Sequence, residues 1–324
     1  MTGRYRPARW LPGGDLMTVF AHVAGRPRGL RPRRERWELD DGDFLDVDRH
    51  GDGEAPTVVA LHGLEGSSRS PYVRRLAAAA QARGLAVAAL NFRGCSGSPN
   101  RLRRLYHSGD TTDLARAVAR LAAERPGRAL AVVGFSLGGN VAAKWFAEGG
   151  AGLPAEVRAG AVVSAPLDLS RCADAIDGGR GIGWIYRERF LRTLRAKAVA
   201  RLARFPDLPW EAAAVRACRT FRRYDDLVTA PLHGFGGVED YYRRASSGPL
   251  LGGVRRPLLV LAADDDPIVP ADVWPAARRS ASPAVAFEVH ARGGHVGFVS
   301  GPPWRIRFHA EERAIAFVAA ELRR

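Results

Sequence analysis

The chain has 324 residues, of which 46% are hydrophobic, and a formal net charge of +15 that comes mostly from arginine. This length predicts one large domain or two smaller ones, and no apolar run reaches the roughly 18 residues of a transmembrane helix. We expect a cytoplasmic protein without cofactor or metal, because no apolar segment follows the early arginines as in a signal peptide and the three cysteines form no Cys-x-x-Cys motif.

The N-terminal residues 1–35 are rich in arginine and are interrupted by proline and glycine. We expect a loosely structured basic arm there, with at most one short helix near residues 16–23. A hairpin follows, because residues 36–39 and 44–48 alternate around Asp41-Gly42.

From residue 57 onward, apolar runs of strand length alternate with helical patterns. The expected elements, in chain order, are strand 57–61, helix 71–83, strand 85–90, helix 110–124, strand 129–133, helix 140–147 and strand 159–164. This order predicts a parallel sheet with helices on both faces.

Residues 166–250 break this alternation, because they are helical, rich in arginine and without a strand signal. Strands return at 257–262 and 284–290, and a closing helix is expected at 309–322. A helical insertion between strands of one sheet indicates a cap. The sequence therefore predicts an α/β core from residues 36–165 and 251–324, and a helical cap from residues 166–250.

The motif Gly134-Phe135-Ser136-Leu137-Gly138 lies between an expected strand and an expected helix. The pentapeptide alone is a weak signal, but a strand–turn–helix setting is what a nucleophile elbow requires. Side chains at Gly134 and Gly138 would collide across so tight a turn. We predict that Ser136 is a nucleophile; the alternative is an idle serine in a glycine-rich turn.

A nucleophilic serine needs a base and an orienting acid, which follow it in the order acid, then histidine, on this kind of sheet. His295 follows the last strand, and its neighbouring glycines are expected to let its loop approach the elbow. Asp266, four residues before Pro270, is the preferred acid, with Asp265 as the alternative. The unused aspartates would cap the following turn.

The oxyanion of the transition state requires preorganised backbone N–H donors. We expect these donors from Leu137, directly after the nucleophile, and from Leu64, in the turn His62-Gly63-Leu64-Glu65-Gly66. An ordinary strand-to-helix loop is the alternative interpretation of this turn.

Six motifs together resemble the YheT-like α/β-hydrolases. They are His62-Gly63-Leu64-Glu65-Gly66-Ser67, Asn91-Phe92-Arg93-Gly94-Cys95-Ser96-Gly97, Tyr106-His107-Ser108-Gly109-Asp110, Gly134 to Asn140, Asp226 to Phe235 and Gly293 to Phe298. The resemblance runs from about Arg9 to the last helix. It implies an α/β-hydrolase fold and a Ser-His-Asp carboxylesterase with Ser136, Asp266 and His295 as its triad. The chain departs from its relatives at Asp15, where they usually carry histidine.

The expected function is hydrolysis of short- to medium-chain carboxylic esters, or of acylglycerol-type lipids, through an acyl-enzyme on Ser136. Acyl transfer to an alcohol with the same triad is one alternative. A hydrolase-fold binding protein without activity is the other. His107 and Arg93 could contact substrate, but we favour a role in holding loops together.

Residues 187–205 predict an amphipathic cap helix with one apolar face, and most of its basic residues lie elsewhere around it. We favour a helix that buries this apolar face on the core. The alternative is that the basic helix meets an anionic membrane and admits an acyl chain to Ser136. We expect a monomer whose substrate is a small-molecule or lipid ester, and no nucleic-acid partner.

Overall fold

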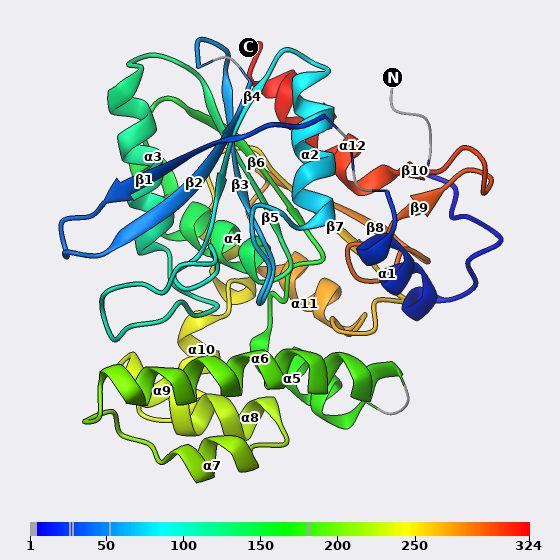
Figure 1. The fold of residues 1–324 in the computed structure, drawn as a ribbon. Coiled ribbons are helices and arrows are strands. Elements are labelled where there is room, and N and C mark those ends of the chain that lie inside the picture. The colour runs from blue at the N-terminus through cyan, green and yellow to red at the C-terminus, as the bar shows by residue number, and fades with distance from the viewer. Residues whose placement is uncertain (1–4, 26, 28, 52, 180–181) are drawn as a thin grey trace.

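An eight-stranded sheet forms the centre of the molecule, which the computed structural model describes for residues 5–25, 27, 29–51, 53–179 and 182–324 (Figure 1). The strand order is β1-β2-β4-β3-β5-β6-β7-β8; β2 is antiparallel to both neighbours and all later pairs are parallel. The strands are β1 (Arg33–Glu38), β2 (Phe44–His50), β3 (Thr57–Leu61), β4 (Ala86–Leu90), β5 (Leu130–Phe135), β6 (Val157–Val163), β7 (Leu258–Ala263) and β8 (Val285–His290). The predicted mostly parallel α/β sheet is confirmed.

Helices cover both faces of this sheet, because successive residues of a strand point to opposite sides. In β3, Val59 and Leu61 belong to one hydrophobic cluster with α3, α4 and α11, whereas Val58 and Ala60 belong to another with α2 and α12. These helices are α2 (Pro71–Gln81), α3 (Thr112–Glu124), α4 (Leu137–Gly149), α11 (Val273–Ser280) and α12 (His309–Glu321). Burial on both faces explains why the parallel strands appear in the sequence as continuous apolar runs.

The predicted strands and helices of the core are present, with ends that differ by a few residues. α4 begins at Leu137 rather than at Asn140, because the helix starts directly after the turn at Ser136. β1 begins at Arg33, within the predicted arm, and Arg34 on it binds Asp48 on β2. The short antiparallel pair β9 (Val299–Ser300) and β10 (Arg307–Phe308) was not expected.

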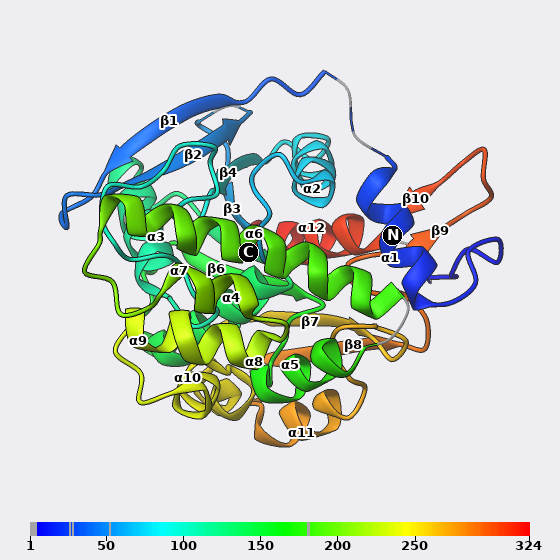
Figure 2. The ribbon, with the colours of Figure 1, turned by 60° about the horizontal axis from the view of Figure 1, so that its bottom comes forward.

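The cap helices lie over the edge of the sheet at which the parallel strands end (Figure 1, Figure 2). They are α5 (Leu169–Gly178), α6 (Ile182–Arg204), α7 (Ala212–Ala217), α8 (Phe221–Tyr224), α9 (Ala230–Leu232) and α10 (Val238–Ala245). On α6, Leu191 and Ala198 are fully buried, as expected, but they pack in a hydrophobic cluster of the cap itself. None of the helices in the described ranges combines the length and hydropathy that a membrane span requires.

The short helix expected near residues 16–23 is present, but the expectation of a loose N-terminal arm around it is wrong for the described residues. Helix α1 (Gly14–Val23) buries Met17 and Ala21 against Val299 of β9. Arg75 of α2, itself paired with Glu311 of α12, donates hydrogen bonds to the carbonyls of Ala21 and Ala24. The apolar partners of α1 come from the other end of the chain, so local sequence could not indicate them. Residues 1–4, 26 and 28 of the predicted arm lie outside the described ranges.

Arg93, which follows β4, forms a buried ionic cluster with three carboxylates. Its guanidinium donates to Asp113 of α3 at 2.7 and 2.8 Å, to Asp41 at 2.7 Å and to Asp43 at 3.0 Å. The side chain is fully buried, and Asp41 and Asp43 belong to the β1–β2 turn. The predicted role of Arg93 in holding loops together is confirmed.

We predict that Arg93→Met lowers the free energy of unfolding by about 3–5 kcal/mol, because it leaves buried carboxylates without their cation. Urea unfolding at neutral pH measures this effect. The matched control is Arg101→Ala, which breaks an ion pair with Glu38 whose side chains are 44% and 61% exposed. That variant is expected to lose less than about 1 kcal/mol. Equal losses in the two variants would contradict the importance of the buried cluster.

Candidate active site

Ser136 occupies a sharp turn between the end of β5 and the start of α4. Its backbone has φ 51° and ψ −124°, a conformation that costs a residue with a side chain about 1–3 kcal/mol. A Cβ at Gly134 would lie 2.3 Å from the Gly138 carbonyl oxygen, and one at Gly138 would lie 2.5 Å from the carbonyl oxygen of His62. The predicted collision across the turn is confirmed for Gly134, whereas a side chain at Gly138 would collide with the end of β3.

The structure brings Ser136, His295 and Asp266 together at the carboxyl edge of the sheet. The Nε2 atom of His295 lies 2.8 Å from the Oγ atom of Ser136, and its Nδ1 atom lies 2.9 and 3.1 Å from the two carboxylate oxygens of Asp266. A carboxylate only accepts hydrogen bonds, so Nδ1 carries the proton and Nε2 accepts from the serine hydroxyl. Asp266 is held in turn by the N–H groups of Ile268 and Val269.

The other two aspartates of the loop after β7 have different surroundings. The Oδ1 atom of Asp265 accepts hydrogen bonds from the N–H groups of Gly293 and Gly294, at 2.7 and 2.8 Å. Asp265 therefore fixes the backbone that leads into His295 and does not contact the imidazole. Asp264 is exposed. Of the three carboxylates, the preferred Asp266 is the one that binds the ring.

Helix α1 also holds the histidine loop, which the sequence did not reveal. The Oγ1 atom of Thr18 accepts from the N–H of His295 at 2.8 Å and donates to the carbonyl of Gly14. A Cβ at Gly294 would lie 2.4 Å from the Gly14 carbonyl oxygen. The expectation that the glycines bring this loop to the elbow is therefore wrong for Gly294, which makes room for α1.

Tyrosine hydroxyls fix the turn after β3, which approaches Ser136 closely. A Cβ at Gly63 would lie 3.0 Å from the Cβ of Ser136. The hydroxyl of Tyr72 accepts from the N–H of Gly63 at 2.9 Å, and that of Tyr106 accepts from the N–H of Glu65 at 2.8 Å. The N–H of Leu64 lies between these two anchored groups. Within the described ranges, this N–H and that of Leu137 have no protein acceptor.

His62, as a neutral imidazole, also stabilises this turn. Its Nε2 atom accepts from the N–H of Phe92 at 3.1 Å, so its Nδ1–H donates to the carbonyl of Gly63, 2.7 Å away. Burial lowers the pKa of His62 to about 4. The ring is therefore uncharged at neutral pH, as these two hydrogen bonds require.

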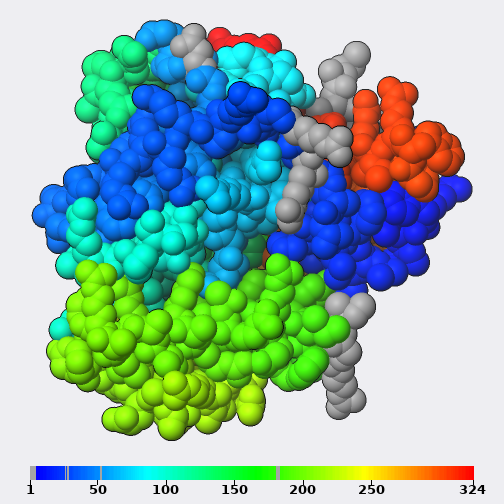
Figure 3. All heavy atoms as spheres, in the orientation of Figure 1, coloured from blue at the N-terminus to red at the C-terminus, as the bar shows by residue number. Residues whose placement is uncertain are grey.

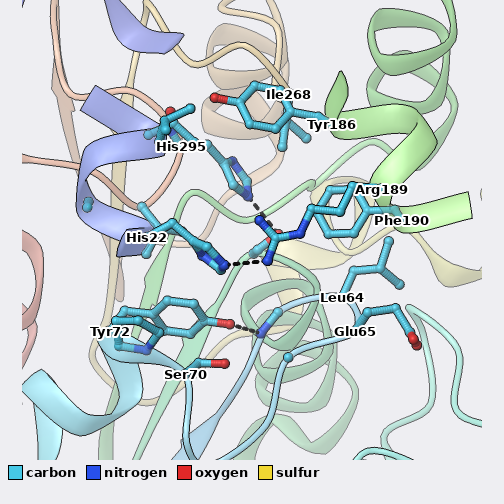
Figure 4. Close-up of a pocket in the computed structure, with 18 of the residues that line it drawn as sticks. His22, Leu64, Glu65, Ser70, Tyr72, Tyr186, Arg189, Phe190, Ile268 and His295 are labelled. Atoms are coloured by element: carbon cyan, nitrogen blue, oxygen red, sulfur yellow. Dashed lines mark hydrogen bonds between the residues drawn. The ribbon is translucent and has the colours of Figure 1, made fainter. Parts of the chain in front are cut away.

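Two cavities meet at Ser136. The larger has a volume of about 470 Å³ and lies between α1, the turn after β3 and the first half of α6. The surface is hollowed where the N-terminal segment, α2 and the cap meet (Figure 3). In Figure 4 the Arg189 side chain reaches across this cavity to His22, and their nitrogen atoms lie 2.7 Å apart. The smaller cavity, about 80 Å³, enters the cap between Leu137 and Tyr242.

His107 lies outside the residues that line either cavity. Its ring packs against those of His233, Phe235 and Tyr241, with centroids 4.5, 5.3 and 5.7 Å away. This packing joins the loop before α3 to the cap, which confirms the structural role favoured for His107. No three His, Cys, Asp or Glu side chains among the described residues are arranged to hold a metal ion.

Comparisons with known proteins bear on the fold and the family of the chain. A family model for the alpha/beta hydrolase fold matches residues 56–302. YheT of Escherichia coli (strain K12), which its name describes as a candidate esterase, is 38% identical over 305 residues, or 93% of this chain and 88% of that protein. The monoacylglycerol lipase of Saccharomyces cerevisiae is 31% identical over 268 residues, or 81% of this chain and 59% of that protein.

The fold is also similar to that of solved esterases. The esterase Pf2001 of Pyrococcus furiosus matches 91% of this chain and 92% of its own, with a TM-score of 0.57 and 18% sequence identity. At this identity the likeness concerns the fold alone.

We predict that the free energy of unfolding falls between pH 6.5 and pH 4. Burial lowers the pKa of His62, His107 and His309 to about 4 and that of His233 to about 3. Below about pH 6.5 these histidines are therefore protonated in the unfolded chain but not in the folded chain. Each of them lowers the free energy of unfolding by roughly 1.4 kcal/mol per pH unit.

Urea unfolding of the wild type and of His107→Phe across this pH range measures the effect. The variant is expected to have a shallower pH dependence than the wild type. Above about pH 8 the two slopes should agree, because histidine is then almost entirely neutral in both the folded and the unfolded state. Parallel curves over the acidic range would contradict the assignment of a lowered pKa to His107.

Proposed function

The chain belongs to the YheT-like branch of the alpha/beta hydrolase fold family, and from this premise we propose that it is a serine carboxylesterase. The observation that carries the proposal is the chain of hydrogen bonds from Ser136 through His295 to Asp266. The family supports a hydrolase. The ester bond and the roles of the three residues are our inference from their geometry.

In the proposed mechanism, the Oγ atom of Ser136 attacks the ester carbonyl while Nε2 of His295 takes its proton. Asp266 holds the productive tautomer and stabilises the imidazolium that forms. The N–H groups of Leu64 and Leu137 donate to the developing oxyanion. Collapse of the tetrahedral intermediate expels the alcohol, which receives the proton from His295. Water, activated by the same imidazole, then hydrolyses the acyl-enzyme.

The two cavities at Ser136 differ in volume, which supports an ester whose acyl and alcohol groups differ in size. The larger would take the bulkier side of the scissile bond, and the smaller, lined mostly by apolar side chains such as Ile176 and Phe221, would take a short chain. We therefore propose short- to medium-chain esters or acylglycerol-type lipids as substrates. The names of the yeast monoacylglycerol lipase and of the mouse phospholipase ABHD3, which is 27% identical over 93% of this chain, support a lipid ester.

An acyltransferase would use the same residues, with an alcohol in place of water at the second step. Product analysis with added alcohol distinguishes it from a hydrolase. A hydrolase-fold binding protein would make no acyl-enzyme at all.

We predict that Ser136→Ala abolishes ester hydrolysis, with a rate loss on the order of 10⁴-fold or more, because it removes the hydroxyl that is bound to Nε2 of His295. A fluorophosphonate probe should label the wild type and leave the variant unlabelled. Hydrolysis of p-nitrophenyl esters measures the rate, and a thermal unfolding curve checks that the variant is folded. More than about a tenth of the wild-type activity in the variant would exclude Ser136 as the nucleophile.

We predict that Asp266→Asn lowers the rate by about 10⁴-fold, because an amide neither stabilises the imidazolium nor keeps its tautomer. Asp264→Asn, at an exposed position in the same loop, is the matched control and should retain nearly full activity. Asp265→Asn should lie between them, because its remaining oxygen can still accept from the histidine loop. If Asp265→Asn instead had the largest effect, Asp265 would be the acid.

A further inference from the structure

Exposed apolar side chains gather around the mouth of the larger cavity. On α1 they are Leu16, Val19 and Val23, and at the start of α6 they are Trp184 and Ile185, with exposed fractions between 40% and 65%. We call these five residues the apolar rim. Only two further large hydrophobic residues in the described ranges are comparably exposed: Leu250, next to the sheet core, and Trp304, between β9 and β10.

The two helices that carry the apolar rim are joined to each other at the cavity. The hydroxyl of Tyr186 donates to the carbonyl of Asp15 at 3.1 Å, and Arg189 contacts His22. Val19 and Val23 of the rim line the cavity that contains Ser136, together with Tyr186 and Arg189. The rim is therefore continuous with the wall of the candidate active site.

Contacts within the protein do not bury the side chains of the rim. The residues of the rim on α1 are spaced three and four apart, so they form one face of the helix, while Met17 and Ala21 fill the opposite face. On α6 the buried residues begin further along, at Leu191. Single exposed apolar residues are common, but a cluster at the entrance of a cavity marks an interaction site. Tryptophan in particular favours the interface between water and lipid.

The charges beside the rim indicate an anionic partner. Arg189 and Arg192 on α6 and Arg69 at the cavity are exposed, and none of the three forms an ion pair with another described residue. Basic residues further along α6 are occupied within the protein: Lys197 binds Glu65, and Arg201 donates to backbone carbonyls. The alternative interpretation of the sequence placed a membrane-binding face along residues 187–205. In the structure, the exposed arginines without a carboxylate partner among the described residues and the exposed apolar groups lie nearer the start of α6, on α1 and at Arg69.

We propose that the apolar rim docks on the surface of an anionic lipid bilayer. The five side chains enter the interfacial region and the neighbouring guanidinium groups face the lipid phosphates. This position directs the mouth of the cavity toward the lipid, so that a lipid ester reaches Ser136 without crossing water. The delivery of substrate rests on the proposed esterase function, whereas the docking itself does not.

Co-sedimentation of the full chain with phosphatidylglycerol and phosphatidylcholine vesicles tests the docking. The wild type should prefer phosphatidylglycerol, and its binding should weaken with salt, because the attraction to surface charge is screened. Leu16→Ser combined with Ile185→Ser should lower the partition coefficient about tenfold or more, since two aliphatic side chains no longer leave water on binding. Arg192→Glu should remove the preference for the anionic lipid.

Leu250→Ser is the matched control, because it makes the same change as Leu16→Ser at a residue of similar exposure, 39% against 45%. It should bind vesicles as the wild type does. Unchanged binding by the rim variant, equal loss in the Leu250 variant, or no binding by the wild type would overturn the proposal.

Hydrolysis of a soluble p-nitrophenyl ester is measured beside the vesicle assay. Leu16, Ile185 and Arg192 do not line the cavity, so every variant should hydrolyse this ester at the wild-type rate. A protein that binds vesicles through the rim but hydrolyses no ester would contradict the esterase function and support the docking.

Discussion

The turn at Ser136 sets a close-packing constraint on which the rest of the site depends. A positive φ at a residue with a side chain, between a strand and a helix, is tolerated only where the surrounding backbone holds it. Gly134 lets the two arms of the turn touch, Gly138 lets the turn approach the end of β3, and Gly63 lets the loop after β3 come within contact of the serine. β5 lies between β3 and β6 in the sheet, so the loop after β3 that contacts the turn comes from a neighbouring strand. The central position of β5 and the glycines around its end together allow the close packing around Ser136.

Segments that are distant in the sequence complete this arrangement, some by binding backbone groups of the loops and one through a buried ionic cluster. Thr18 of α1 and Asp265 after β7 accept hydrogen bonds from the histidine loop after β8. Tyr72 at the start of α2 holds the turn after β3. Arg93 joins the β1–β2 turn to α3 through buried carboxylates. The geometry of the candidate site is therefore maintained by polar contacts between segments from nearly the whole length of the chain.

The cap and α1 together decide what can reach Ser136. α6 closes one side of the larger cavity and α1 closes the other, although the two helices are more than a hundred and fifty residues apart in the chain. Each contributes exposed apolar side chains next to the opening. The features proposed for chemistry and for lipid contact thus meet at one edge of the molecule.

The sequence by itself determined the sheet, the turn at Ser136 and the order in which the acid and the histidine follow it. Buried parallel strands must be continuous apolar runs, and the turn at Ser136 demands glycine at fixed spacing, so both leave local patterns. The choice of Asp266 over Asp265 was only a preference, because both carboxylates follow the same strand and differ in which backbone and ring atoms lie opposite them. The packing of α1, the contact of Thr18 with the histidine loop and the role of Gly294 left no local signal. Only the tertiary structure decided them, because the groups that they contact lie at the far end of the chain and come into reach when the sheet is formed.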